Sequence, residues 1–217
     1  MVALVVLLGA AWALLFSPLT ALEDVEATTT AESPYVDLAE VSAAADPQVG
    51  TPLARVDTEA VDEAVRALPG VADAEVVRAW PTGLEIEVTP RVPVAVTQVD
   101  GGWALLDDTG TEVAQVDEPD GTLPQVDVPD DPEDGTRALT SLLEALGEMP
   151  TELRSQVASA AVSAQGVITL TLTDGAEVLW GSSEESTLKS EVLLVLIEQS
   201  PSSRYDVSIP TRPTTGG

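Results

Sequence analysis

The sequence contains neither cysteine nor histidine among its 217 residues. These two absences exclude Cys–His and Ser–His–Asp nucleophilic machinery, zinc sites built on thiolate or imidazole ligands, and any disulfide framework. Carboxylates are the groups left for acid–base chemistry. We therefore expect no catalytic residues, no metal and no cofactor.

Basic residues and aromatic residues are also scarce. Nine Lys and Arg stand against 37 Asp and Glu, which gives a formal net charge of -28, and aromatic residues make up 3% of the chain. Such an excess of negative charge opposes binding to nucleic acid and to anionic lipid headgroups. The acidity indicates a solvated surface and excludes a nucleic-acid-binding role.

The first 22 residues lack any charged side chain. A helix over 1–22 would extend roughly 33 Å, enough to cross a hydrocarbon core of about 30 Å. A cleaved signal peptide is the alternative, although no basic region precedes the apolar run, and a buried core helix is a third reading. We expect an uncleaved transmembrane anchor over 1–22. Its orientation is not indicated by charge, since the first basic residue is Arg55, and we expect a basic cytoplasmic tail ahead of this start.

Two alternating segments predict a hairpin over 71–88. Apolar Leu84, Ile86 and Val88 are separated by glutamates, which is the period-2 pattern of a strand with one buried face. Before them, Ala72, Ala74 and Val76 alternate with acids, and the Trp80–Gly83 segment supplies the turn. The hairpin should have an acidic outer face, and an apolar helical stripe over 61–68 should cover its inner face.

The elements around this hairpin predict a small α+β domain over 23–90. A strand is expected at 25–28, and Ser33-Pro34 should begin a first helix that ends before Pro47. Asp57 or Thr58 should cap the second helix, which ends at Pro69-Gly70. The predicted order is strand, helix, helix, strand, strand.

The segment 91–210 predicts a second, mainly antiparallel β domain with covering helices. Strands are expected at 94–99, 103–106, 111–116, 158–164, 167–173, 176–180 and 205–209, and an acidic loop at 117–135. Helices are expected at 139–146 and 184–199, and the apolar stripe of the first, Leu139, Leu142, Leu143 and Leu146, should cover a face of the sheet. Ser182 with Glu185 is read as a capping box for the last helix. Three tryptophans at strand ends, Trp80, Trp103 and Trp180, are expected to cap core edges and not to bind ligands. The remaining 211–217 is read as a polar tail.

The last predicted strand is the candidate partner-binding site. Its members are Tyr205, Asp206, Val207, Ser208, Ile209 and Pro210. Alternation predicts Tyr205, Val207 and Ile209 on the inner face. Because no further strand is expected after it, we predict an edge position, where a partner segment could add by β-augmentation.

The run LPGVADAEVVRAWPTGLEIEVTPRVPVAV, residues 68–96, resembles the bacterial FtsQ/DivIB family. The matching features are the helix and "LP-x-V" turn of a POTRA domain, the "R-x-W-P" hairpin, and the domain junction at Arg91 and Pro93. Pro90 departs from the family pattern, which has an acid there. GVITLTLTDGAEVLWGSS (166–183) and YDVSIP (205–210) are similar to the second domain of the same family.

This resemblance implies a non-enzymatic, single-pass membrane scaffold of the division machinery. It implies a cytoplasmic N-terminus, a large extracytoplasmic part at the division septum, control of septal cell-wall synthesis, and partners of the FtsB and FtsL type. One alternative is a membrane-tethered cell-wall hydrolase, which needs two carboxyl groups within roughly 5 to 10 Å across a cleft. The other is a POTRA module of a transport system, for which no barrel follows in the sequence.

Overall fold

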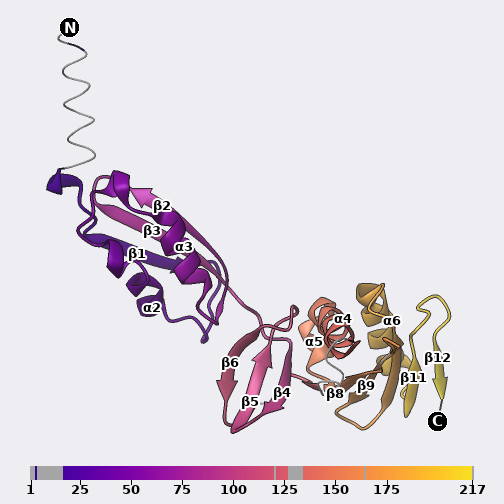
Figure 1. The fold of residues 1–217 in the computed structure, drawn as a ribbon. Helices are drawn as coiled ribbons and strands as arrows, with labels where there is room; N and C mark the ends of the chain where they lie inside the picture. Colours follow the sequence, from indigo (N-terminus) through magenta and orange to yellow (C-terminus); the bar gives the residue numbers. More distant parts are fainter. Residues whose placement is uncertain (1–2, 4–16, 120, 127–133, 164, 217) are drawn as a thin grey trace. The chain divides into compact units, whose positions relative to one another are not determined.

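The chain forms two compact units, divided between Arg91 and Val92. The structure, a computed structural model, describes residues 3, 17–119, 121–126, 134–163 and 165–216 (Figure 1). Each described unit has its own hydrophobic core.

Unit 1 contains the predicted order of strand, helix, helix, strand, strand. A short 3-10 turn, η1 (Pro18–Thr20), precedes β1 (Asp24–Thr29), α2 (Leu38–Ala43), the 3-10 turns η2 (Asp46–Gln48) and η3 (Leu53–Arg55), α3 (Thr58–Arg66), β2 (Val71–Ala79) and β3 (Gly83–Pro90). The three strands form one sheet in the order β1-β3-β2, with β1 parallel and β2 antiparallel to β3. The predicted hairpin is confirmed.

The inner face of this sheet differs from the predicted pattern at one position. Leu84, Ile86 and Val88 of β3 are buried as expected. In β2 the buried residues are Val71 and Ala74, whereas Ala72 is exposed. The pairing register shifts between Val71 and Asp73, because β2 has one extra residue there relative to β3. This bulge reverses the alternation of buried and exposed side chains along β2.

The two helices of unit 1 begin at aspartates. The Asp57 Oδ1 accepts a hydrogen bond from the Ala60 N–H at 3.1 Å and caps α3, as predicted. The prediction that Ser33-Pro34 starts the first helix is wrong. Helix α2 begins at Leu38, where Asp37 Oδ1 accepts from the Ala39 N–H at 2.8 Å.

The predicted membrane anchor over 1–22 falls mainly on residues outside the described ranges. Among the residues that are described, no helix has the length and apolar character needed to cross a bilayer. Leu22, which the sequence assigns to the predicted span, is fully buried in the core of unit 1. Its N–H donates to Thr51 O at 2.9 Å, which ties it to the loop before η3.

Unit 2 is built on one mixed sheet, with β12-β11-β10-β9-β8-β7-β4-β5-β6 as the order of its described strands. In chain order its elements are β4 (Ala95–Val99), β5 (Gly102–Leu106), β6 (Glu112–Val116), β7 (Gln125–Val126), α4 (Asp134–Glu148), α5 (Thr151–Arg154), β8 (Val157–Val162), β9 (Ile168–Leu172), β10 (Glu177–Gly181), α6 (Ser186–Gln199), β11 (Arg204–Asp206) and β12 (Thr214–Gly216). Most neighbouring pairs are antiparallel, as predicted.

Strand β7 joins the two halves of this sheet. It lies within the segment 117–135, which the sequence predicts as a loop. Gln125 pairs in parallel with Val96 of β4 on one side and with Ser159 of β8 on the other. Val126 is 1% exposed and belongs to the core of unit 2.

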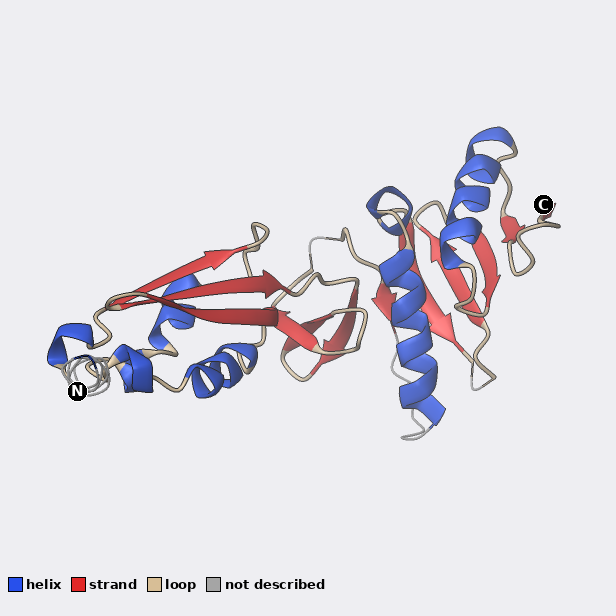
Figure 2. Ribbon diagram, turned by 90° about the horizontal axis from the view of Figure 1, so that it is seen from above, coloured by secondary structure: helices blue, strands red, loops and turns tan. Residues whose placement is uncertain are grey.

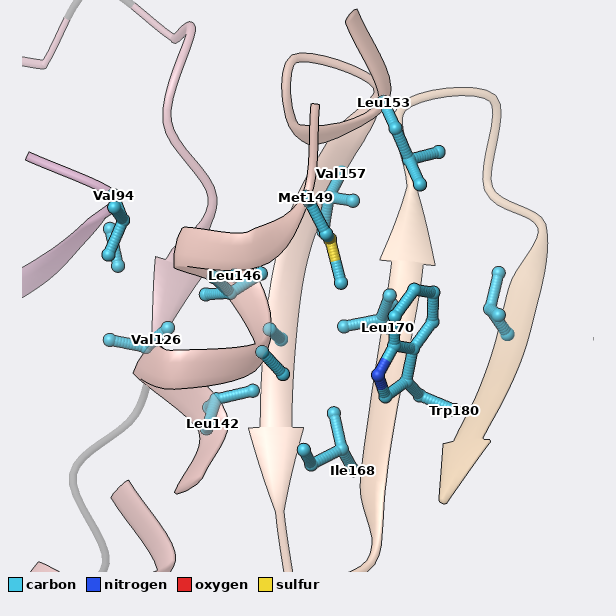
Figure 3. Close-up of a cluster of buried hydrophobic side chains, with 14 of the residues drawn as sticks. Val94, Val126, Leu142, Leu146, Met149, Leu153, Val157, Ile168, Leu170 and Trp180 are labelled. Carbon is cyan, nitrogen blue, oxygen red and sulfur yellow. The ribbon is translucent and has the colours of Figure 1, made fainter. Parts of the chain in front are cut away.

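The helices of unit 2 gather on one face of the sheet (Figure 2). Leu142 and Leu146 of α4 join Leu170 of β9 and Trp180 of β10 in one buried cluster (Figure 3). The apolar stripe predicted on α4 is therefore confirmed as a core surface. The opposite face of strands β9 to β12 carries exposed or half-buried residues, including Thr169, Glu177 and Leu179.

Candidate partner-binding site

The predicted site residues lie in β11 and the turn that follows it. Tyr205 and Val207 are buried, at 2% and 0% exposure, as the alternation predicts. Ile209 is 60% exposed, so its predicted inward position is wrong. Strand β11 ends at Asp206, and the chain at Ile209 has already entered a turn.

The predicted edge position of this strand is also wrong. Strand β11 pairs in parallel with β10 on one side and antiparallel with β12 on the other. Residues 211–217, read from the sequence as a polar tail, contain this additional strand. In the described sheet the end strand is β12 (Thr214–Gly216), so the edge lies one strand further out.

Short-range hydrogen bonds explain why the chain turns back. The carboxylate of Asp206 accepts from both the N–H and the hydroxyl of Ser208, at 3.0 and 2.6 Å. The Arg212 N–H donates to Ile209 O at 2.9 Å and closes the turn. The hydroxyl of Ser202 then donates to Gly216 O at 2.5 Å, which holds the end of β12 against the start of β11.

The open face of this end of the sheet is hollowed. A depression of about 380 Å³ is lined by strands β9 to β12, namely by Thr169, Glu177, Leu179, Arg204, Tyr205, Asp206 and Thr214–Gly216. Arg204 forms a 3.1 Å ion pair with Glu177 across two neighbouring strands, and both side chains are well exposed. The hollow therefore combines an apolar floor at Leu179, polar threonines and a pair of charges beside the edge strand.

A buried polar network lies on the covered face, where β10 leads into α6. The indole N–H of Trp180 donates to Ser186 Oγ at 3.2 Å, and Ser186 Oγ donates to Ser183 O at 2.8 Å. Lys189 is 1% exposed, and its ammonium donates to Ser182 O at 2.8 Å. Burial lowers the pKa of Lys189, and the negative charges of Glu185 and Glu184 oppose that shift.

This network corrects two predictions. Glu185 is the residue before α6 and adopts a left-handed conformation at φ 57°, without a side-chain cap, so Ser182 and Glu185 form no capping box. In this turn the carbonyl groups of Ser182 and Ser183 accept hydrogen bonds from Lys189 and Ser186. Trp180 is fully buried, so it belongs to the core itself and not to the core edge.

The domain junction is joined to unit 1 at Gly70. The backbone N–H of Arg91 donates to Gly70 O at 2.8 Å. A Cβ on Gly70 would stand 2.0 Å from the carbonyl oxygen of Tyr35, so only glycine fits there. Pro93 follows in unit 2, immediately before the buried Val94. The family-like junction residues therefore stand where the chain leaves the first core and enters the second.

The acidic outer face predicted for the hairpin is present. Glu26 of β1, Glu75 of β2, and Glu85 and Glu87 of β3 line one shallow hollow of about 360 Å³ with Thr28 and Val77. All four carboxylates are exposed. The face is consistent with a solvated surface.

Sequence reasoning missed β12 because its residues carry no apolar alternation. The sequence Thr214-Thr215-Gly216 has two β-branched residues, which favour strands, but no side chain that must be buried. All three residues are exposed in the structure.

Two family models match this chain, one in each unit. The model of the POTRA domain, FtsQ-type, covers residues 32–91, and the model of the C-terminal part of cell division protein FtsQ/DivIB covers residues 95–209. Cell division protein FtsQ of Streptomyces venezuelae is 34% identical over 99% of this chain and 81% of its own length. The proteins of the same name from Streptomyces collinus and Mycolicibacterium smegmatis are 34% and 37% identical over 99% and 98% of this chain. The matched region spans 86% of the former protein and 62% of the latter.

Proposed function

The chain belongs to the FtsQ/DivIB family of cell division proteins, and from this premise we propose that it is a non-enzymatic, single-pass membrane scaffold of the division machinery. It connects division proteins on the outer side of the cell membrane and contributes to the control of septal cell-wall synthesis. The observation that carries this proposal is that FtsQ-type models match both units, over 32–91 and 95–209. Neither the hydrolase nor the transport-module alternative gains support from these matches.

The C-terminal end of unit 2 supplies the partner-binding site. An extended segment of an FtsB- or FtsL-type partner adds to the outer side of β12, with its main chain forming the hydrogen bonds. Its side chains enter the hollow beside Leu179, Arg204 and Thr215. Of the residues predicted from the sequence, 205–210, Tyr205 and Asp206 belong to the inner strand β11, and the others form the turn that leads to β12.

A proline scan of the edge tests this site. Thr215→Pro removes a backbone donor and places a ring on the edge strand, so capture of a purified FtsB-type segment should be lost. Thr215→Ala keeps the backbone and should still capture the segment. Val207→Pro is the control for misfolding, because the Val207 N–H donates to Leu179 O at 3.0 Å inside the sheet. If Thr215→Pro captured the segment as well as the wild type does, the β12 edge would be ruled out as the partner-binding site.

Unit 1 acts as the localisation module. Its sheet has three strands with β1 and β2 at its ends, and such edges are available for pairing. Deleting 23–90 should abolish septal placement, whereas unit 2 should still fold. Unchanged placement of the deletion variant would contradict this role.

The division role is tested in dividing cells. A fluorescent fusion should concentrate at septa, and depletion of the protein should block their completion. A uniform envelope signal together with normal septa after depletion would overturn the scaffold proposal.

The membrane anchor over 1–22 is tested by intact mass. Protein from the membrane fraction should retain its first residues. A mature chain that begins between Ala21 and Thr30 would refute an uncleaved anchor.

A further inference from the structure

One end of unit 1 is held together by backbone hydrogen bonds around the point where the chain enters its core. The Leu22 N–H donates to Thr51 O at 2.9 Å, and Leu22 O accepts from the Gly50 N–H at 2.9 Å. The next residue, Glu23, donates its N–H to Thr82 O at 2.9 Å. The loop before η3 and the β2–β3 turn therefore both adjoin the segment between η1 and β1, at the same end of the unit (Figure 1).

Apolar side chains are exposed at this end of the unit. Leu19 in η1 is 83% exposed, Val49 in the loop before η3 is 51% exposed, and Trp80 after β2 is 52% exposed. The position of Leu19 is fixed by a local cap and not by packing, because its N–H donates to Ser17 Oγ at 3.2 Å. A single exposed apolar residue is ordinary on a protein surface, but several at one end of a domain indicate a contact. We name Leu19, Val49 and Trp80 the entry tip.

Trp80 has the properties of a residue at a membrane–water interface. The indole N–H of the buried Trp180 donates to Ser186 Oγ, whereas the indole N–H of Trp80 has no hydrogen-bond partner among the described residues. An exposed ring that combines an apolar body with a free N–H donor is favoured where hydrocarbon meets polar headgroups. The side chain that the sequence predicted as a cap of the core edge is therefore suited to a second, external contact.

The uncharged run of the sequence leads directly to this end of the unit. Residues 1–16 carry no charged side chain, and only the five residues 17–21 separate them from Leu22 in the core. At about 3.5 Å per residue, even a fully extended connection of this length spans roughly 20 Å. The turn η1 shortens it further. With the preceding run in a bilayer, this short tether keeps the entry tip within reach of the headgroups, where even a weak contact forms.

We propose that the entry tip rests on the lipid bilayer, with its three apolar side chains inserted among zwitterionic headgroups, and that this contact sets the orientation of unit 1 at the membrane surface. The inference rests on the proposed membrane anchor. Anionic lipid is not preferred, because the exposed carboxylates of Glu23 and Asp24 adjoin the tip. A second copy of this chain is disfavoured as the occupant, because two copies that each carry a net charge of -28 repel one another.

The chain has no cysteine, so a single introduced thiol carries one fluorophore. The full chain with Val49→Cys, or with Ala72→Cys as control, is labelled and reconstituted into phosphatidylcholine vesicles that contain nitroxide-labelled lipid. Ala72 is exposed near the far end of β2, eight residues from Trp80 and thus roughly 26 Å away along the strand direction. We expect the lipid nitroxide to quench the label at position 49 several-fold more than the label at position 72. Replacing part of the phosphatidylcholine by anionic phosphatidylglycerol should not increase this quenching.

Two further variants separate insertion from mere closeness to the membrane. In the labelled Val49→Cys background, Trp80→Ala and Leu19→Ser should each lower the quenching about twofold or more, because each removes an apolar group from the lipid contact. Leu19 lies outside the core of unit 1, so Leu19→Ser keeps the fold. Val167→Ala, which truncates an exposed valine of unit 2, is the matched control and should leave the quenching unchanged.

Flotation of the same vesicles on a density gradient reports on the anchor separately. A chain that floats with the lipid while positions 49 and 72 are quenched equally would overturn the tip contact and leave the anchor in place, whereas a chain that does not float would overturn both. Quenching at position 49 that neither Trp80→Ala nor Leu19→Ser lowers would show closeness without docking and would also overturn the proposal. Efficient disulfide dimerisation of unlabelled Val49→Cys in the vesicles would assign the tip to a second copy instead of to lipid.

Discussion

At the scale of single residues, Lys189 is a buried cation without a carboxylate bonded to it among the described residues. Its ammonium bonds to Ser182 O, and burial lowers its pKa. In the unfolded chain the pKa of a lysine is about 10.4. Between the lowered folded value and that value the unfolded chain binds more protons than the folded chain, so stability must rise with pH.

We therefore predict that the pH profile of stability depends on Lys189. The free energy of unfolding of the wild type, relative to that of Lys189→Met, should increase as pH rises toward about 10.4, because the cost of burying the charge disappears on deprotonation. Methionine keeps the length of the side chain and cannot titrate. Urea unfolding of both proteins at several alkaline pH values measures this difference. Parallel profiles would show that Lys189 is not destabilised as a cation.

Gly70 is a second residue with a specific structural role, because its Cα lies too close to the backbone of Tyr35 for any side chain to fit. An added Cβ would lie 2.0 Å from Tyr35 O, and Gly70 O also receives the Arg91 N–H. Gly70→Ala should destabilise unit 1 by at least about 1–3 kcal/mol, because a backbone segment must move to relieve the overlap. Gly216→Ala, where the added Cβ meets open space, should change stability by less than about 0.5 kcal/mol. Urea denaturation followed by circular dichroism compares the two variants.

At the scale of elements, helix α2 begins after Asp37 in the structure, whereas the sequence pattern placed its start at Ser33-Pro34. Asp37→Ala should cost about 0.5–2 kcal/mol, because the Ala39 N–H loses its capping carboxylate. Ser33→Ala should be nearly neutral, within about 0.5 kcal/mol, since α2 begins at Leu38, five residues later. Thermal unfolding of the two variants measures both effects. A larger loss from Ser33→Ala than from Asp37→Ala would place the helix start where the sequence pattern suggested.

At the scale of the whole molecule, the described residues form two cores that have no member in common. We predict that residues 92–217 fold when expressed alone, and that the full chain unfolds in urea in two steps. Gly70→Ala should move one of these steps and leave the other in place. A single transition that shifts as a whole would show that the two units unfold cooperatively.

The local order of elements could be predicted from the sequence because it depends on neighbouring residues. The alternation of Leu84, Ile86 and Val88 predicted β3, the spacing of Leu142 and Leu146 predicted the buried side of α4, and Asp57 predicted a helix start. In each case the same side chains that predict the element also stabilise it, either because they are buried in the core or because they cap the helix. The LPGV and RAWP motifs likewise indicated the family that the comparisons established.

Only the tertiary structure decided those features that depend on contacts between residues far apart in the sequence. Strand β7 has two residues, too few for a pattern, and exists because β4 and β8 pair with it on both sides. Strand β12 has no residue that must be buried, and its pairing with β11 moved the predicted edge from 205–210 to 214–216. Helix α6 shows both contributions. Val192 and Leu196 pack against the core around the buried Leu193, as expected of a helix that covers the sheet. The first turn of the helix instead buries Ser186 and Lys189, because the carbonyl groups of Ser183 and Ser182 in the β10–α6 turn need hydrogen-bond donors.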